Sequence, residues 1–154
     1  MYICEMSIEV AIKQYKFNND FEKAVINILY TASWLEGQNI QRFKPYGISP
    51  QQFNVLRILR GASPNPVRLT DITERMIDKN SNATRLVEKL RQKGFLKRDV
   101  CKNNRRQVDI TITPNGLSLL NELDILPSEW SKIFKGIKKE EAKQLNVILD
   151  KIRE

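Results

Sequence analysis

The sequence predicts a mainly helical fold with one small β-hairpin, an α+β arrangement, and three observations predict it. Apolar residues recur every three or four positions over most of the 154 residues, as on the buried face of an α-helix. Between about residues 95 and 112 the period changes to two, as in a strand. Hydrophobic residues make up 41% and charged residues 29% of the chain, which is ordinary for a globular domain, and no apolar run is long enough to span a membrane.

A long amphipathic helix is expected near the N-terminus. Asp20 offers an N-cap, and the helix runs to about Phe43, where Pro45 and Gly47 end it. Its apolar stripe consists of Phe21, Val25, Ile28, Leu29, Ala32 and Leu35. A short helix before it places Ile8, Ala11 and Ile12 on one side.

Three shorter helices are expected next. Ser49 caps the first, with Pro50 at the first helical position and Gln52 at the reciprocal place of a capping box. The second is capped by Thr70 and turns inward the apolar residues Ile72, Met76 and Ile77. The third runs from about Ser81 to Lys93, and Gly94 stops it; its inward face consists of Ala83, Leu86, Val87 and Leu90.

A hairpin and two further helices complete the chain. Residues 95–100 and 108–112 are expected as strands around a polar loop at 101–107. A helix follows Pro114, and a last helix begins near Lys138 with the apolar stripe Ala142, Leu145, Ile148, Leu149 and Ile152. Two short helices, a tight turn and a basic hairpin form a winged helix-turn-helix, whose second helix enters the major groove of DNA.

The positive charge is concentrated in one part of the chain. The net charge is +8, and residues 75–106 hold 11 basic and three acidic side chains, so the remaining residues are neutral overall. A focused basic block on a neutral protein favours a polyanionic partner over a merely solvated basic surface.

Several chemistries are excluded or disfavoured. The chain has no histidine, which rules out Ser-His-Asp and Cys-His triads and histidine-containing metal sites. Cys4 and Cys101 form neither a disulfide framework nor a zinc ligand set, although Lys102 beside Cys101 leaves a redox role open. We therefore expect no enzymatic activity, no cofactor and no metal. No signal peptide is visible, so a cytoplasmic protein without membrane association is expected.

The outward face of the helix expected from about Ser81 to Lys93 carries side chains suited to base edges and phosphates. We predict DNA contacts from this helix and from the hairpin loop, made by Ser81, Asn82, Thr84, Arg85, Lys89, Lys102, Arg105 and Arg106. The alternative is a solvated helix face, which periodicity does not exclude. Adjacent arginines in the loop favour the DNA interpretation, because like charges repel unless an anion is nearby.

The stretch SNATRLVEKLRQKGFLKR at 81–98, followed by NRRQVDITITPNG at 104–116, resembles the MarR family of bacterial transcriptional regulators. Thr84-Arg85-Leu86-Val87 matches the recognition helix of that family, Lys93-Gly94 its end, and Arg105-Arg106 its wing. The stretch KPYGISPQQFNVLRIL at 44–59 is similar to the entry of the family's second helix. Asn104 departs from the family, which usually has an aspartate that shapes the wing at this place.

The resemblance covers about residues 20–153 and implies a homodimer that regulates transcription, as a repressor, from a palindromic operator in double-stranded DNA. It divides the chain into an N-terminal arm with the first dimerisation helix (1–45), a winged helix-turn-helix domain (46–113) and C-terminal dimerisation helices (114–154). The terminal apolar stripes favour a partner independently, since few other elements are left to cover them.

Many members of that family release DNA when a small, often aromatic, ligand binds between the two subdomains. The resemblance places Tyr30, Trp34 and Tyr46 where such an effector pocket is lined, and the alternative is that they are core aromatics. Another class of function stays open as well: a winged-helix protein-interaction module whose basic face binds an acidic protein.

The hairpin loop leads to a testable prediction. A hairpin does not enter the groove segment that the recognition helix occupies, so Arg106 should contact the sugar-phosphate backbone. Replacing Arg106 by alanine is expected to lower the affinity for operator DNA and for random DNA about equally. It should also lower the slope of log affinity against log salt by about one unit. Alanine at Arg85 should instead cost about 1–3 kcal/mol on operator DNA and relax sequence preference. Affinities measured against salt on both DNAs check this, and unchanged slopes in the Arg106 variant contradict it.

Overall fold

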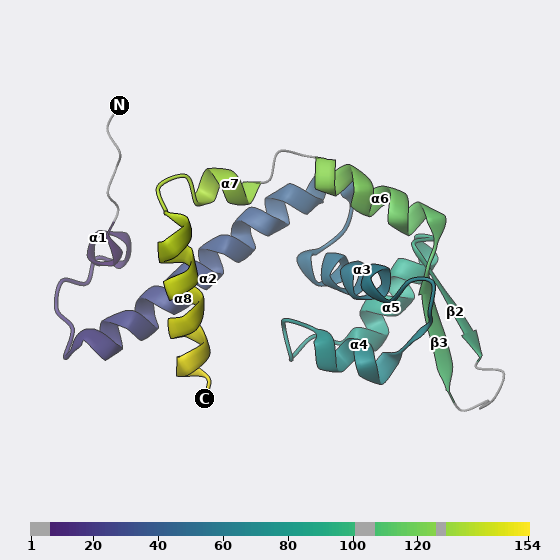
Figure 1. The fold of residues 1–154 in the computed structure, drawn as a ribbon, viewed down its shortest axis with the longest axis horizontal. Coiled ribbons are helices and arrows are strands. Elements are labelled where there is room, and N and C mark those ends of the chain that lie inside the picture. Colours follow the sequence, from purple (N-terminus) through teal and green to yellow (C-terminus); the bar gives the residue numbers. More distant parts are fainter. Residues whose placement is uncertain (1–6, 101–106, 126–128) are drawn as a thin grey trace. The chain divides into compact units, whose positions relative to one another are not determined.

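The computed structural model describes residues 7–100, 107–125 and 129–154, and the chain divides into two compact units, residues 1–54 and 55–154. The elements in chain order are α1 (Ile8–Ile12), α2 (Asp20–Phe43), the 3-10 helix η1 (Lys44–Tyr46), α3 (Pro50–Ala62), β1 (Val67–Arg68), α4 (Leu69–Arg75), α5 (Ala83–Gln92), β2 (Leu96–Val100), β3 (Val108–Ile112), α6 (Pro114–Ile125), α7 (Glu129–Ile133) and α8 (Lys139–Ile152) (Figure 1). This architecture confirms the predicted fold class. None of the described helices is long and apolar enough to cross a membrane.

In the first unit, helix α2 begins one residue earlier than the sequence predicts. Asn19, rather than Asp20, is the N-cap, and its side-chain oxygen accepts a hydrogen bond from the Glu22 backbone N–H at 2.9 Å. Asp20 is already helical, where a carboxylate favours the positive end of the helix dipole. Lys23 on α2 pairs with Glu9 on α1 at 2.5 Å, and this hydrogen-bonded cation lowers the pKa of Glu9 to about 2.

The turn between α2 and α3 has the form that the sequence predicts. Gly47 has a φ of 65°, in the left-handed region that glycine adopts without strain. The capping box is present: the Ser49 backbone N–H donates to the Gln52 side chain at 3.0 Å, and the Gln52 N–H donates to the Ser49 hydroxyl at 3.1 Å. The rings of Phe43 and Phe53 stack with centroids 4.4 Å apart.

Helix α2 leaves apolar side chains exposed on two opposite faces. Phe21, which is 84% exposed, and Leu29 belong to the predicted stripe. At 100° per residue, Tyr30 and Trp34 lie on the other side of the helix, and both are also exposed. A helix that is apolar on both faces is typical of one that becomes buried in an assembly.

The second unit is built around a three-stranded antiparallel sheet in the order β1-β3-β2. The two-residue strand β1, which the sequence did not indicate, pairs Val67 with Ile110, and β2 pairs Leu96 with Ile112. Helix α4 contacts α5, and α5 contacts β2 (Figure 1). The large side chains fully buried here are Val55, Leu56, Leu59, Ile72, Met76, Val87, Leu90, Leu96, Ile110, Leu120 and Leu123.

Two expectations for α4 are wrong. The helix begins at Leu69 with Arg68 at the N-cap position, so Thr70 lies inside the first turn and is not the cap. Ile77 is 80% exposed instead of facing inward. The reason is that α4 ends at Arg75 and Met76 adopts an extended backbone, which turns the following residue away from the core.

A hydrogen-bonded junction joins the end of α5, the sheet and the start of α6. The Thr113 hydroxyl donates to the Gly94 carbonyl at 2.6 Å and accepts from the Gly116 backbone N–H at 3.1 Å. The Thr113 N–H donates to the Phe95 carbonyl at 3.0 Å. A β-carbon at Gly116 would overlap with that same carbonyl oxygen and would lie 2.7 Å from Cγ1 of Ile112. The junction therefore requires glycine at position 116.

The C-terminal helices agree with the prediction except for α7, which the sequence did not indicate. Helix α8 follows Lys138, whose backbone N–H donates to the Glu141 carboxylate at 2.7 Å. Its apolar stripe is exposed in the single chain, with Leu145, Ile148 and Ile152 each 45–60% accessible. Trp130 on α7 and Phe134 after it are exposed as well.

Replacing Gly116 by alanine is expected to destabilise the protein by at least about 1–3 kcal/mol, because the new methyl group meets a backbone carbonyl that cannot move without breaking the junction. Gly136→Ala is the matched control, since a β-carbon there has nothing within 4 Å. Urea unfolding followed by circular dichroism measures both. Equal midpoints for the two variants would contradict the close approach.

Candidate nucleic-acid interface

The helix predicted to contact DNA begins later than expected, at Ala83 rather than Ser81. Asn82 is its N-cap, and the Asn82 side-chain oxygen accepts a hydrogen bond from the Arg85 backbone N–H at 3.0 Å. The Ser81 hydroxyl donates to Asp78 at 3.0 Å in the preceding turn. Both predicted contact residues thus hold the turn before α5 and its first residues in place.

The outward face of α5 has the composition that the sequence predicts. Thr84, Arg85 and Lys89 are exposed, whereas Ala83, Val87 and Leu90 are buried and Leu86 is half-buried. The hydroxyl, guanidinium and ammonium groups of the exposed residues donate hydrogen bonds, as recognition of base edges and phosphates requires.

The basic side chains around α5 are not equally available. Arg91 is held by Glu88, with nitrogen–oxygen distances of 3.0 and 2.7 Å. This hydrogen-bonded pair lowers the pKa of Glu88, and the Gln92 amide and the positive charge of Arg98 act in the same direction. Lys79 donates to the backbone carbonyl of Glu74. Arg85 and Lys89 are therefore better placed than Arg91 and Lys79 to contact a polyanion.

The hairpin contributes Lys97 and Arg98, which are exposed on β2. The predicted contacts Lys102, Arg105 and Arg106 lie outside the described residues, and so do Cys4 and Cys101. In the part of the chain that is described, no cluster of three or more cysteine and acidic side chains could hold a metal ion.

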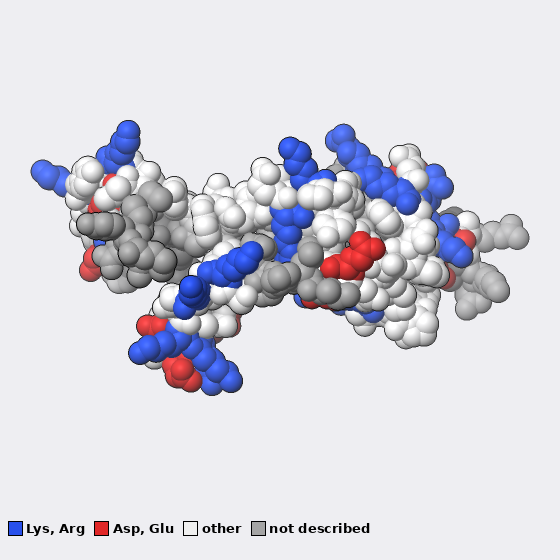
Figure 2. Space-filling model, turned by 90° about the horizontal axis from the view of Figure 1, so that it is seen from above, with Lys and Arg blue, Asp and Glu red and all other residues white. Residues whose placement is uncertain are grey.

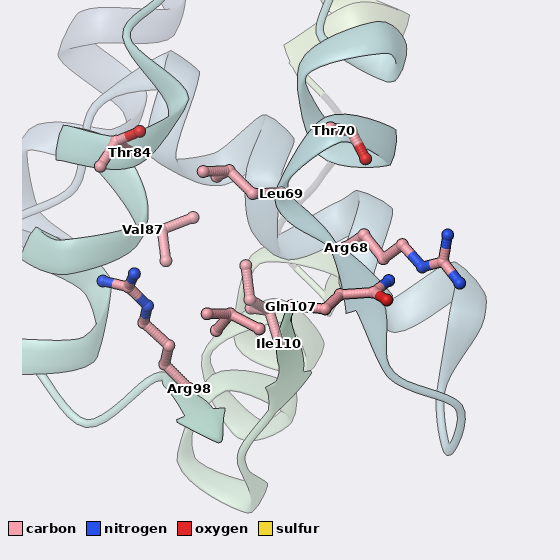
Figure 3. Close-up of a pocket in the computed structure, with 9 residues that line it drawn as sticks. Arg68, Leu69, Thr70, Thr84, Val87, Arg98, Gln107 and Ile110 are labelled. Atoms are coloured by element: carbon pink, nitrogen blue, oxygen red, sulfur yellow. The ribbon is translucent and has the colours of Figure 1, made fainter. Parts of the chain in front are cut away.

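A cavity of about 450 Å³ lies between α5, the start of α4 and the sheet. Its apolar lining includes Leu69, Val87 and Ile110, and its polar lining includes Thr70, Thr84 and Arg98 (Figure 3). Arg98 belongs to the basic segment 75–106, but it is not among the residues predicted to contact DNA. The alternation of side chains along the strand 95–100 could have shown that Lys97 and Arg98 lie on opposite faces of the hairpin.

Basic side chains are not confined to the α5 region. Figure 2 shows lysine and arginine in several separate groups on the visible surface, together with smaller groups of acidic side chains. The excess charge of residues 75–106, rather than the presence of basic residues as such, is what distinguishes the α5 region.

The predicted effector residues all lie in the first unit. Tyr30 and Trp34 are exposed one turn apart on α2, and Tyr46 is half-buried in η1. The exposure of Tyr30 and Trp34 argues against the alternative that they are core aromatics of the single chain. Their role in ligand binding stays a prediction.

Known proteins share this fold and sequence pattern. The model of the MarR family matches residues 48–108. YkoM of Bacillus subtilis, named as an uncharacterised HTH-type transcriptional regulator, is 30% identical over 114 residues, which cover 73% of this chain and 73% of that protein. Two crystal structures have a similar fold. A MarR-like transcription regulator from Bacillus cereus has a TM-score of 0.75 and 23% identity, and the match covers 87% of this chain and 96% of that chain. A mutant MarR from Escherichia coli complexed with operator DNA has a TM-score of 0.77 and 20% identity, and the match covers 90% of this chain and 99% of that chain.

The fold, a helix-turn-helix followed by a small antiparallel sheet, is that of a winged-helix protein. The chain belongs to the MarR family and is a transcriptional regulator of the helix-turn-helix type. This confirms the resemblance found in residues 81–98 and 104–116. The two crystal structures, at 23% and 20% identity, show that the fold is shared.

Because Asn82 caps α5, its removal should affect stability as well as DNA binding. Asn82→Ala is expected to lower the free energy of unfolding by about 1 kcal/mol, whereas Asn82→Ser keeps a capping oxygen and should stay within a few tenths of the original. Thermal unfolding measures both. If Asn82→Ser retains full stability and still loses sequence preference on DNA, the amide reads bases in addition to capping; if the alanine variant is as stable as the serine variant, the capping role is wrong.

Proposed function

We propose that the protein binds a palindromic operator in double-stranded DNA as a homodimer and represses transcription from it. In this proposal residues 46–113 bind DNA, and residues 1–45 and 114–154 hold the dimer together. The observation that carries it is the exposed set Thr84, Arg85 and Lys89 on one face of α5, within the segment that holds the whole excess charge. The E. coli MarR structure, which shares the fold, was solved with operator DNA.

Dimer formation is supported by apolar side chains that the single chain leaves uncovered. They lie on α2, at Phe21, Val25 and Leu29, and on α8, at Leu145, Ile148 and Ile152. Exposed apolar patches of this kind mark interaction surfaces, and homodimers with two-fold symmetry are the commonest assemblies. Release of DNA by a small aromatic ligand completes the proposal, with the exposed Tyr30 and Trp34 as its candidate contacts.

Selection of duplexes from a random pool tests the DNA function. A palindrome with half-sites about one helical turn apart is expected. Random DNA should then compete poorly for the complex. A protein that selects no sequence and is released equally by any duplex would instead fit the interaction-module alternative, in which the basic face binds an acidic protein.

The dimer is tested by placing a charge in the stripe of α8. Ile148→Glu is expected to give monomers, or a large rise in the dimer dissociation constant, because a carboxylate cannot be buried there without a partner. Lys143→Glu is the control: it lies on the opposite face of α8 and makes a larger change in charge. Light scattering at micromolar concentration reports the mass of each variant. An original protein that is monomeric and well folded would contradict the proposal.

A further inference from the structure

We propose that the cavity between α5 and the sheet seats one sugar-phosphate unit of the DNA backbone, with Arg98 as the cation that holds the phosphate. The inference rests on the proposed DNA-binding function and adds a contact that fixes the position of α5 in the groove. Four properties of the cavity carry it: its donors, its lining, its place beside the outward face of α5, and the strand pairing that sets the direction of Arg98.

Among the described residues that line the cavity there is no acid, and the Thr70 hydroxyl has one acidic neighbour outside the lining, Asp71, to which it donates at 3.5 Å. Thr70 and Thr84 supply hydroxyl groups, and Arg98 supplies a guanidinium directed toward the α5 side (Figure 3). Arg98 makes no ion pair or hydrogen bond with another described residue, in contrast to Arg91, which Glu88 holds. Arg68, across the cavity, points away and can donate to the side-chain oxygen of Gln107. Arg98 is therefore the cation available to a bound anion.

The lining fits a sugar-phosphate better than a bare phosphate. Leu69, Val87 and Ile110 make an apolar surface between the polar groups (Figure 3). At about 450 Å³ the cavity is larger than a phosphate group needs. A deoxyribose ring can pack on the apolar surface while its phosphate meets the donors.

The cavity adjoins the helix that the proposed function places in the major groove, because residues of α5 line it. Thr84 is the residue before Arg85, on the exposed face of α5, and it also lines the cavity. A phosphate at Thr84 and Arg98 therefore sits at the edge of the groove that Arg85 reaches into, and such contacts set the register of a protein on the duplex.

The pairing of the strands sets the face of the sheet on which Arg98 lies. It pairs with Ile110 across β2 and β3, so the two side chains share one face, and Ile110 is buried at the cavity. Lys97, its neighbour on the same strand, points to the opposite face. This pair gives a matched comparison: two adjacent cations on one strand, of which one faces the cavity.

The experiment uses the duplex selected by the protein and a series of the same duplex with one neutral methylphosphonate at each position in turn. Arg98→Gln is expected to lose affinity on the order of tenfold and to lower the salt slope by about one unit. At one position of the series, the methylphosphonate should lower the affinity of the original protein by a similar factor. The same modified duplex should bind the Arg98→Gln variant almost as well as the unmodified duplex does. The Thr84→Val variant should bind the unmodified duplex more weakly than the original protein. The methylphosphonate at the same position should then cost it less affinity than it costs the original protein.

In the Lys97→Gln variant, the methylphosphonate at that position should lower the affinity as much as it does in the original protein. The Arg98→Lys variant keeps the positive charge that Arg98→Gln removes, so its slope of log affinity against log salt should be close to that of the original protein. Circular dichroism of each variant is the control for folding, and folded variants are expected because the substituted side chains are exposed. The inference is overturned if Arg98→Gln keeps its affinity and its methylphosphonate profile, or if Lys97→Gln loses as much as Arg98→Gln. It is also overturned if Arg98→Gln loses only the binding of inorganic phosphate, which would assign the cavity to a free anion. Each of these three results leaves the selected duplex bound by the original protein, so the proposed function would stand.

Discussion

The close approach of Gly116 to the carbonyl oxygen of Phe95 is the constraint on which the second unit depends. It lets α6 start directly behind the sheet, where the Thr113 hydroxyl bridges the end of α5 and the first turn of α6. Because the Phe95 carbonyl also accepts from Thr113, the helix end and the strands share one set of hydrogen bonds. A change in any of these parts displaces the others, so the orientation of α5 relative to the hairpin is set here.

The same region shows how a basic segment is divided between structure and recognition. Asn82 and Ser81 are used to begin α5, and Glu88 neutralises Arg91. Arg85 and Lys89 stay exposed on the helix, and Arg98 is held on the sheet at the cavity. Net charge alone cannot make this division, because it depends on which side chains find a partner within the chain.

Most of the fold could be predicted because the periodicity is strong and the caps are local. The capping box at Ser49 and Gln52 and the strand 108–112 follow from neighbouring residues alone. The parts that could not be predicted depend on distant partners. Strand β1 is two residues long and exists only because β3 pairs with it, and Ile77 is exposed because α4 ends early.

The candidate site follows the same rule. The exposed residues of α5 could be predicted from spacing, as Thr84 and Arg85 show. The capping role of Asn82 required the true start of the helix, which lies two residues beyond the predicted one. The cavity required the pairing of Arg98 with Ile110, and hence the register of the sheet.

Helix α2, 24 residues long and apolar on opposite faces, has a consequence for how the proposed dimer behaves in a cell. Mass action makes the folded population of such a chain rise with its own concentration, since association removes the exposed surface from water. Newly made chains at low abundance would be the ones most open to proteolysis. Doubling the rate of synthesis would then more than double the amount of active dimer, without any ligand.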